Sequence, residues 1–147
     1  MFAAITAASH GSKVLLLEAN ERLGKKLLIT GKGRCNVTND CAGDEVLKNV
    51  PRNGRFLYSA MDACPPSYVM EFFQKNGCQL KTERGNRVFP VCDKSASVLD
   101  CLRDVMRRLH VTVRTSRVVQ ILTEDGNVTG VRTNSETLNS DWVVLAT

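Results

Sequence analysis

The chain has 147 residues, of which 43% are hydrophobic and 24% charged, and its formal net charge is +5. This length and composition are those of one globular domain with a single core, and no apolar run approaches the ~18 residues that a membrane-spanning helix needs. The apolar first residues lack a cationic leader and a small-residue cleavage site. A secretory signal is therefore not expected. The expected location is the cytoplasm.

The first predicted elements are a short helix and a buried strand. Residues 1–10, MFAAITAASH, are small and mostly apolar and end at Gly11, which predicts a helix closed by a glycine. The apolar run Val14–Leu17, followed by Glu18, has the pattern of a parallel strand buried on both faces. Helix, glycine, strand and acid together indicate the second half of a βαβ nucleotide-binding unit.

The next segment, Gly24–Asn39, reads GKKLLITGKGRCNVTN and contains three glycines, four cations and no acid. It is too rich in glycine for a good helix and too basic for a core strand, so it predicts a loop that wraps an anionic ligand. Five of the 20 basic residues of the chain lie within residues 22–34, which favours a site over a uniformly charged surface. No aromatic residue lies in this segment, so the stacking platform of a single-strand nucleic-acid binder is missing.

Residues 41–93 are expected to form a helical insertion. The expected elements are, in chain order, helices over 53–61 and 65–76 and strands over 79–83 and 87–89. Two prolines open the second helix and Gly77 ends it, while Arg84-Gly85-Asn86 is the turn between the strands.

Residues 94–147 are expected to form a Rossmann-like core together with residues 1–40. The expected elements are a helix over 94–109, strands over 111–113, 118–122 and 128–131, a strand beginning at Leu138 and a strand over 142–147. Asp125-Gly126-Asn127 predicts a hairpin turn. This order indicates an α/β fold, a parallel sheet with helices and a late β-meander. The first strand and the glycine-rich turn of the nucleotide-binding unit would precede Met1, so the chain is expected to be truncated at both ends.

The six cysteines stand at irregular intervals without a C-x-x-C pair, and the two histidines are far from them in sequence. This spacing argues against a zinc site and against a disulfide framework, and no metal is expected. Cys35 stands apart, because Arg34 beside it is expected to lower its pKa and the loop to leave it accessible. The alternative is a buried structural thiol.

Glu18 stands where a dinucleotide-binding unit carries the acid that accepts hydrogen bonds from ribose hydroxyls. The alternative is a solvated residue at the end of a strand.

The run LLLEANERLGKKLLITGKGRCNVTN, with GNRVFPVCDKSASVLDCL further on and VVLAT at the end, resembles a family of bacterial flavoproteins. These are FAD-dependent oxidoreductases of the HI-type aminoacetone oxidase family, with a glutathione-reductase-like Rossmann domain, and the resemblance covers nearly the whole chain. It implies an incomplete FAD-binding domain and hydride transfer through the flavin to or from a small-molecule substrate. NAD(P)H is a possible electron donor.

The resemblance also implies the cofactor-binding residues, which are Glu18, Lys25, Lys26, Gly31, Gly33, Arg34, Cys35, Asn36, Val118, Ala146 and Thr147. By this resemblance Glu18 binds the adenosine ribose, the two lysines lie near that end of FAD, and the G-R-C-N segment lines the cleft near the pyrophosphate and the flavin. Val118 meets the adenine through its backbone, and the last two residues begin a segment close to FAD.

Several of these residues have a simpler interpretation. Lys25 and Lys26 could be solvated charges, and Val118 an ordinary strand residue. Lys32 or Arg34 could stabilise negative charge on a reduced flavin, and no residue stands out as a general acid or base. Without the glycine-rich turn the chain is expected to bind FAD weakly or not at all, and this fragment alone is expected to be inactive although the resemblance implies an enzyme.

Two other functions stay open. The basic residues 22–34 could bind RNA or another polyanion without catalysis, although the lack of aromatic residues there argues against nucleic acid. The chain could also be an inactive truncated remnant.

Overall fold

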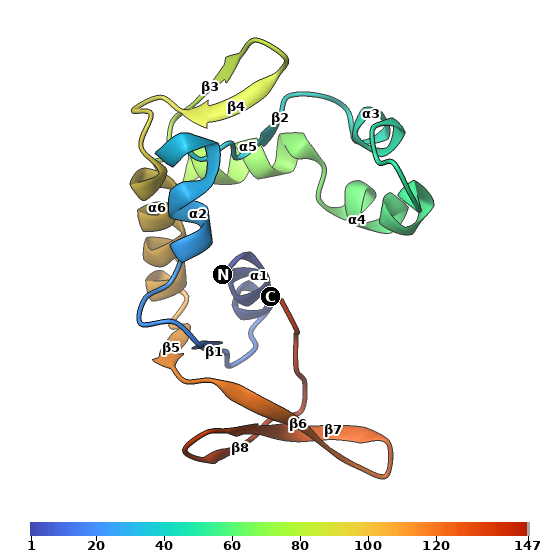
Figure 1. Ribbon diagram of the computed structural model, residues 1–147, viewed down its shortest axis with the longest axis vertical. Helices are drawn as coiled ribbons and strands as arrows, with labels where there is room; N and C mark the ends of the chain where they lie inside the picture. The colour runs from blue at the N-terminus through green and yellow to red at the C-terminus, as the bar shows by residue number, and fades with distance from the viewer. Residues whose placement is uncertain (147) are drawn as a thin grey trace. The chain divides into compact units, whose positions relative to one another are not determined.

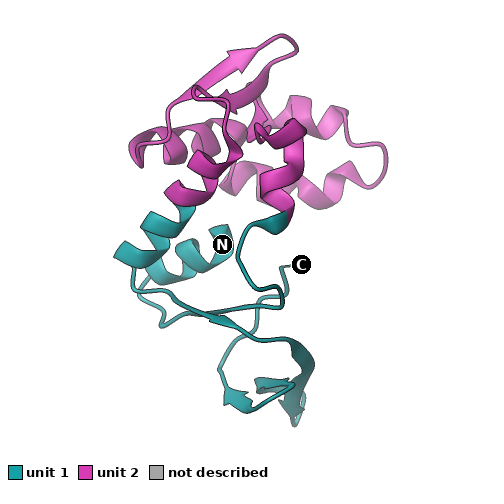
Figure 2. Cartoon of the chain, turned by 60° about the vertical axis from the view of Figure 1, so that its left-hand side comes forward, with its two compact units in different colours: residues 1–25, 102–147 teal, residues 26–101 magenta. Residues whose placement is uncertain are grey.

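The structure, a computed structural model, describes residues 1–146 (Figure 1). The chain divides into two compact units (Figure 2). The first unit comprises residues 1–25 and the chain from Leu102 onward, and the second comprises Lys26–Cys101.

The first unit begins with the predicted helix and strand. Helix α1 (Phe2–Ser9) is followed by Gly11 in the left-handed region, with φ 87°. Strand β1 (Leu15–Glu18) pairs in parallel with β5 (Thr112–Thr115), with Glu18 opposite Thr115. The predicted α/β pattern with a parallel strand pair is therefore confirmed.

The same unit ends in the predicted β-meander. Its strands are β6 (Val118–Glu124), β7 (Asn127–Thr133) and β8 (Thr137–Asn139), joined antiparallel in that order. Asp125 and Gly126 both have positive φ, 50° and 79°, as a two-residue hairpin turn requires. Gly130 lies so close to the Leu138 carbonyl that a Cβ would stand 2.1 Å from its oxygen.

The predicted strand over 142–147 is wrong for its described part, and Thr147 lies outside the described residues. Residues 142–146 form no ladder with any described strand, and Trp142, Val144 and Leu145 are exposed. An apolar run becomes a strand only where a neighbouring strand offers hydrogen-bond partners for its backbone.

The second unit contains several short helices and a small sheet. The helices are α2 (Lys25–Ile29), whose first residue belongs to the first unit, the 3₁₀-helix η1 (Thr30–Gly33), α3 (Gly43–Lys48), the 3₁₀-helix η2 (Gly54–Leu57), α4 (Tyr58–Ala63) and α5 (Pro66–Lys75). The sheet consists of β2 (Thr38–Asn39), β4 (Arg87–Pro90) and β3 (Leu80–Glu83), antiparallel in this order.

The predicted long helix is α6 (Ser95–Arg108), which begins in the second unit and ends in the first. Within the second unit, Val88 of β4 and Val98 of α6 are almost fully buried, as is Phe73 of α5. These side chains form the apolar core on which the residues of the basic segment lie.

Gly24–Asn39 is not a loop throughout, which corrects the prediction. Residues 25–29 are α-helical, and residues 30–33 form a tight turn in which the backbone of Gly31 and Lys32 is left-handed. The physical reason is that KKLLI consists of residues tolerated in helices, and the glycines stand only at its borders, with Gly24 at φ 76° and Gly31 at φ 55°.

The expected organisation, a core of residues 1–40 and 94–147 with an insertion at 41–93, stays a prediction. Among residues 1–146 no helix is long and apolar enough to cross a membrane.

Candidate functional site

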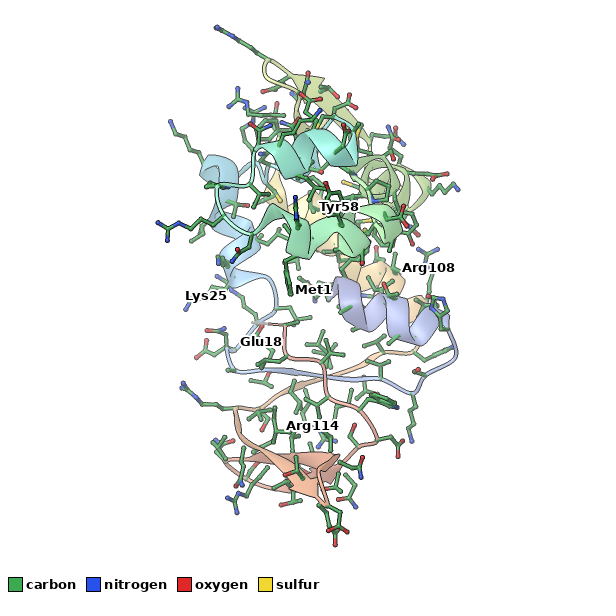
Figure 3. The ribbon with its side chains drawn as sticks, turned by 90° about the vertical axis from the view of Figure 1, so that its right-hand side faces the viewer. Met1, Glu18, Lys25, Tyr58, Arg108 and Arg114 are labelled. Atoms are coloured by element: carbon green, nitrogen blue, oxygen red, sulfur yellow. The ribbon has the colours of Figure 1, made fainter. Side chains whose placement is uncertain are left out.

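Glu18 ends strand β1 as a half-buried carboxylate (Figure 3). Its Oε1 accepts two hydrogen bonds from Asn20, from the backbone N–H at 2.8 Å and from the side-chain Nδ2 at 2.7 Å. These bonds hold the pKa of Glu18 below its ordinary value, with smaller contributions from the Ala19 backbone N–H and from the positive amine of Met1. Oε2 takes part in neither bond, so an ionised oxygen at the end of a parallel strand can accept hydrogen bonds from a ligand hydroxyl.

Lys25 and Lys26 open helix α2 and are exposed. Neither lysine forms an ion pair with a described residue. Their charges are therefore available to an anion. Lys26 also lines a pocket of the second unit.

An open pocket of about 350 Å³ lies within the second unit. Its lining residues are Lys26, Leu27, Thr30, Cys35, Asn36, Val37, Phe73 and Val98. Lys26, Cys35 and Asn36 were predicted site residues. The apolar members from α5 and α6 were not predicted, because nothing in their own helices signals that they face a basic segment that ends more than 30 residues earlier in the chain.

Gly31 and Gly33 lie in a run of left-handed backbone, with φ 55° at Gly31, 57° at Lys32 and 84° at Gly33. A Cβ on Gly31 would stand 3.0 Å from the backbone N of Asn36 and 3.3 Å from the Phe89 ring. A Cβ on Gly33 would meet nothing within 4 Å. Gly31 is thus required by the packing of the chain on itself, and Gly33 by its backbone conformation alone.

Arg34 is tied to the small sheet of the second unit. Its Nε donates to Asp93 at 2.8 Å, and its Nη2 contacts both Asp93, at 2.7 Å, and Glu83. The guanidinium carbon stands 4.1 Å from the centre of the Phe89 ring, a cation–π contact. Lys81 joins the same carboxylates, at 2.7 Å from Asp93. The charge of Arg34 is therefore balanced inside the protein.

The expectation of an accessible, activated thiol at Cys35 is wrong. Cys35 is 6% exposed, and burial raises its pKa. The adjacent arginine does not lower it, because the guanidinium turns to Glu83 and Asp93 instead.

Asn36 holds the same segment to β2 and β4. With its amide nitrogen facing them, it donates to the carbonyls of Val88 at 3.2 Å and Thr38 at 3.0 Å. The neighbouring Val37 N–H donates to the Val88 carbonyl at 2.8 Å.

The last predicted residues lie in the first unit. Val118 begins β6 opposite Thr133 and is exposed, as is Ala146 in the irregular C-terminal segment. Thr147 lies outside the described residues. The structure thus brings together Lys26, Gly31, Gly33, Arg34, Cys35 and Asn36 in the second unit, and holds Glu18, Lys25, Val118 and Ala146 in the first.

Three residues that contact predicted site residues were not themselves predicted. Asn20 donates to Glu18, and Glu83 and Asp93 pair with Arg34. For Asn20 a signal existed, since an asparagine two positions after an acid can cap its carboxylate. Among residues 1–146 no group of three or more His, Cys, Asp or Glu side chains could hold a metal ion.

Comparison with known proteins bears on this arrangement. The chain matches the family described as "HI0933-like protein Rossmann domain" over residues 1–147. It is 34% identical over 146 residues to the 3-dehydro-bile acid delta(4,6)-reductase of Clostridium scindens, an alignment that covers 98% of this chain and 35% of that protein. It is 28% identical over 148 residues to the ribosomal RNA dihydrouridine synthase of Escherichia coli, covering 100% of this chain and 36% of that protein.

The chain thus spans about a third of the length of the curated relatives that it matches. The family match extends over its whole length and includes both the strand that ends in Glu18 and the segment with Gly31 and Arg34. The chain belongs to the HI0933-like Rossmann domain family.

Proposed function

We propose that this chain is the FAD-binding portion of a flavin-dependent oxidoreductase. The observation that carries the proposal is the ionised carboxylate of Glu18 at the carboxyl end of a parallel strand, with one oxygen free of its bonds to Asn20. A carboxylate at this position of a Rossmann fold suits the two hydroxyls of an adenosine ribose. Membership of a Rossmann-domain family supports the same assignment.

The exposed amines of Lys25 and Lys26 suit the negative pyrophosphate. The left-handed backbone at Gly33, which has open space around it, suits a close approach of the cofactor, as do the pocket-lining atoms of Cys35 and Asn36. We include Gly31, Arg34, Val118, Ala146 and Thr147 in the proposed site through the family resemblance alone. When bound, FAD would supply the ring that carries the hydride, and NAD(P)H is the proposed electron donor.

The names of the two relatives suggest the chemical class of the substrate. One name describes a reductase of double bonds at positions 4 and 6 of a 3-dehydro-bile acid, and the other a synthase of dihydrouridine in ribosomal RNA. In both kinds of compound the reduced carbon–carbon double bond is conjugated with a carbonyl group. We therefore propose an α,β-unsaturated carbonyl compound as the substrate of the protein to which this domain contributes.

The cofactor assignment is tested by titrating the flavin-free form of a full-length protein that contains this domain with FAD and with FMN while following the flavin fluorescence. Replacement of Glu18 by Ala is expected to raise the Kd for FAD about tenfold, because hydrogen bonds to a charged acceptor are lost. FMN lacks the adenosine ribose, so its Kd should not change. Glu21→Ala, which removes an exposed acid three residues away, is the matched control. Equal Kd values for FAD in the Glu18 variant and the unaltered chain would contradict the proposal.

The substrate class is tested under anaerobic conditions with the reduced, FAD-loaded form of a full-length protein that contains this domain. Cyclohexenone should reoxidise the flavin, whereas cyclohexanone, which has the carbonyl but no double bond, should not. Reoxidation at equal rates by both compounds would remove the conjugated double bond from the proposal.

A second candidate is reduction of a base in RNA, which the Escherichia coli relative and the net charge of +5 favour. Its mark is RNA binding that falls steeply with salt and weakens when the exposed residues Lys25, Lys26 and Lys32 are replaced by Gln. RNA affinity that does not respond to salt or to these replacements would exclude it.

A further inference from the structure

The β3–β4 hairpin is flanked by two cysteines outside the proposed cofactor site, Cys78 before β3 and Cys92 after β4. The Val91 N–H donates to the Gln79 carbonyl at 2.9 Å and so extends the antiparallel ladder by one bond. Cys78 and Cys92 are the next residues beyond this bond. Cys78 precedes β3, and Cys92 lies in a turn after β4 that the Asp93 N–H closes by donating to the Pro90 carbonyl at 2.9 Å.

The hydroxyl of Ser97 contacts both thiols. Cys92 Sγ lies 3.2 Å from Ser97 Oγ, and Cys78 Sγ lies 3.9 Å from the same oxygen. Ser97 itself is held by donating to the Lys94 carbonyl at 2.8 Å, in the turn that begins α6. Both thiols therefore contact one oxygen at the start of α6, and their sulfur atoms lie no more than about 7 Å apart.

The two thiols differ in their surroundings. Cys92 is exposed, and its hydrogen bond to Ser97 lowers its pKa, with a further contribution from the Lys94 backbone. Cys78 is 5% exposed, and burial raises its pKa. Burial also raises the pKa of Cys41 and Cys64, so Cys92 is the thiol that forms a thiolate more readily than these.

We propose that Cys78 and Cys92 form a redox-active dithiol that a hydroperoxide converts to a disulfide. The Cys92 thiolate attacks the outer oxygen of the peroxide, the O–O bond breaks, and the alkoxide or hydroxide leaves and takes up a proton. The resulting sulfenic acid is attacked by the sulfur of Cys78. The S–S bond forms as the S–O bond breaks, and the hydroxide leaves as water with the proton of the Cys78 thiol.

The two thiols are oxidised by two electrons in total, and the peroxide is reduced to an alcohol, or to water when it is hydrogen peroxide. The exposed Cys92 meets the oxidant, and the buried Cys78 resolves the sulfenic acid before a second oxidation can occur. An external dithiol reduces the disulfide back to the two thiols by thiol–disulfide exchange and is itself oxidised to a disulfide.

The test uses hydrogen peroxide on the unaltered chain, followed by blocking of free thiols and digestion with trypsin. Trypsin separates the two cysteines, because Lys81, Arg84 and Arg87 lie between them. The expected product joins the peptides NGCQLK and VFPVCDK with the loss of two hydrogens, and dithiothreitol restores the separate peptides. Before oxidation, iodoacetamide should modify Cys92 about tenfold faster than Cys64.

Matched variants give the proposal its controls. Cys92→Ser should abolish the joined product and Cys64→Ser should leave it unchanged, while Ser97→Ala should slow its formation several-fold. Cys78→Ser should let Cys92 proceed to the sulfinic acid, visible as two added oxygens on VFPVCDK.

Three results would overturn the proposal. They are separate singly blocked peptides after peroxide, a joined product that contains CNVTNDCAGDEVLK in place of VFPVCDK, and equal alkylation rates of Cys92 and Cys64. None of these measurements depends on a bound flavin.

Discussion

Glu18 and Arg34 are two charged residues of the run that resembles a flavin-binding segment, and the structure holds them in different ways. Glu18 is restrained by Asn20, two residues along the chain, through one of its two oxygens. Arg34 is bound by Glu83 and Asp93, which are 49 and 59 residues away. A charge restrained locally on one side remains available to a ligand, whereas one enclosed by two acids and an aromatic ring serves the fold.

The same contrast extends to the neighbours of Arg34. Gly31 and Asn36 contact the chain itself, through Phe89 and the carbonyls of β2 and β4. The segment therefore stabilises the fold of the second unit as well as offering charges to a ligand, and those charges are the exposed amines of Lys25, Lys26 and Lys32.

The largest expected effect is on stability at Gly31. Gly31→Ala should lower the free energy of unfolding by about 2 kcal/mol, because it combines a left-handed backbone with a Cβ that crowds Asn36 and Phe89. Gly33→Ala has the left-handed backbone without the crowding and should cost about 1 kcal/mol. Urea unfolding of both variants measures the difference. Equal losses of unfolding free energy would mean that the contacts with Asn36 and Phe89 do not constrain Gly31.

A second comparison sets Arg34→Met against Glu18→Ala. Removal of the guanidinium leaves Glu83 and Asp93 with Lys81 but without the second cation that they share, so the urea midpoint should fall while the Kd for FAD changes less than about twofold. Glu18→Ala should show the opposite pattern, weaker FAD binding with little change in the midpoint. A large loss of FAD affinity in a folded Arg34→Met variant would show that the Arg34 side chain itself binds the cofactor.

The carboxylates around Arg34 also predict a pH dependence. The cations hold the pKa values of Glu83 and Asp93 below their ordinary values of 4.5 and 3.8, so their contribution to stability is complete above those values. It is lost as the pH falls through the lowered pKa values. The urea midpoint should therefore decrease between about pH 5 and pH 3, and decrease less in Arg34→Met. Arg52→Met, at an exposed site, is the control that should retain the full decrease.

The smallest expected effect concerns Asn20. Asn20→Ala removes the side-chain hydrogen bond to Glu18 and leaves the backbone bond, so the pKa of Glu18 should rise while the carboxylate stays ionised near neutral pH. Only its positioning is weakened, and the Kd for FAD should rise about twofold to threefold. Flavin titration measures this change, and a rise as large as that of Glu18→Ala would show that orientation of the carboxylate governs binding.

The sequence by itself determined the elements whose signals are local. The apolar run before Glu18 became a parallel strand, the turn at Asp125 and Gly126 joined two antiparallel strands, and the periodic apolar face of residues 94–109 became helix α6. Such signals suffice because hydrophobic period, turn residues and helix borders act within a few positions of the chain.

Only the tertiary structure decided the partners of these residues. It paired Arg34 with acids of the β3–β4 region, buried Cys35, left residues 142–146 without a ladder, and set Ser97 between two thiols. Each of these outcomes depends on which distant segment packs alongside. A charge, a thiol or an apolar run has the same sequence whether that neighbour is present or absent, so its pKa, accessibility and pairing are fixed only when the chain folds.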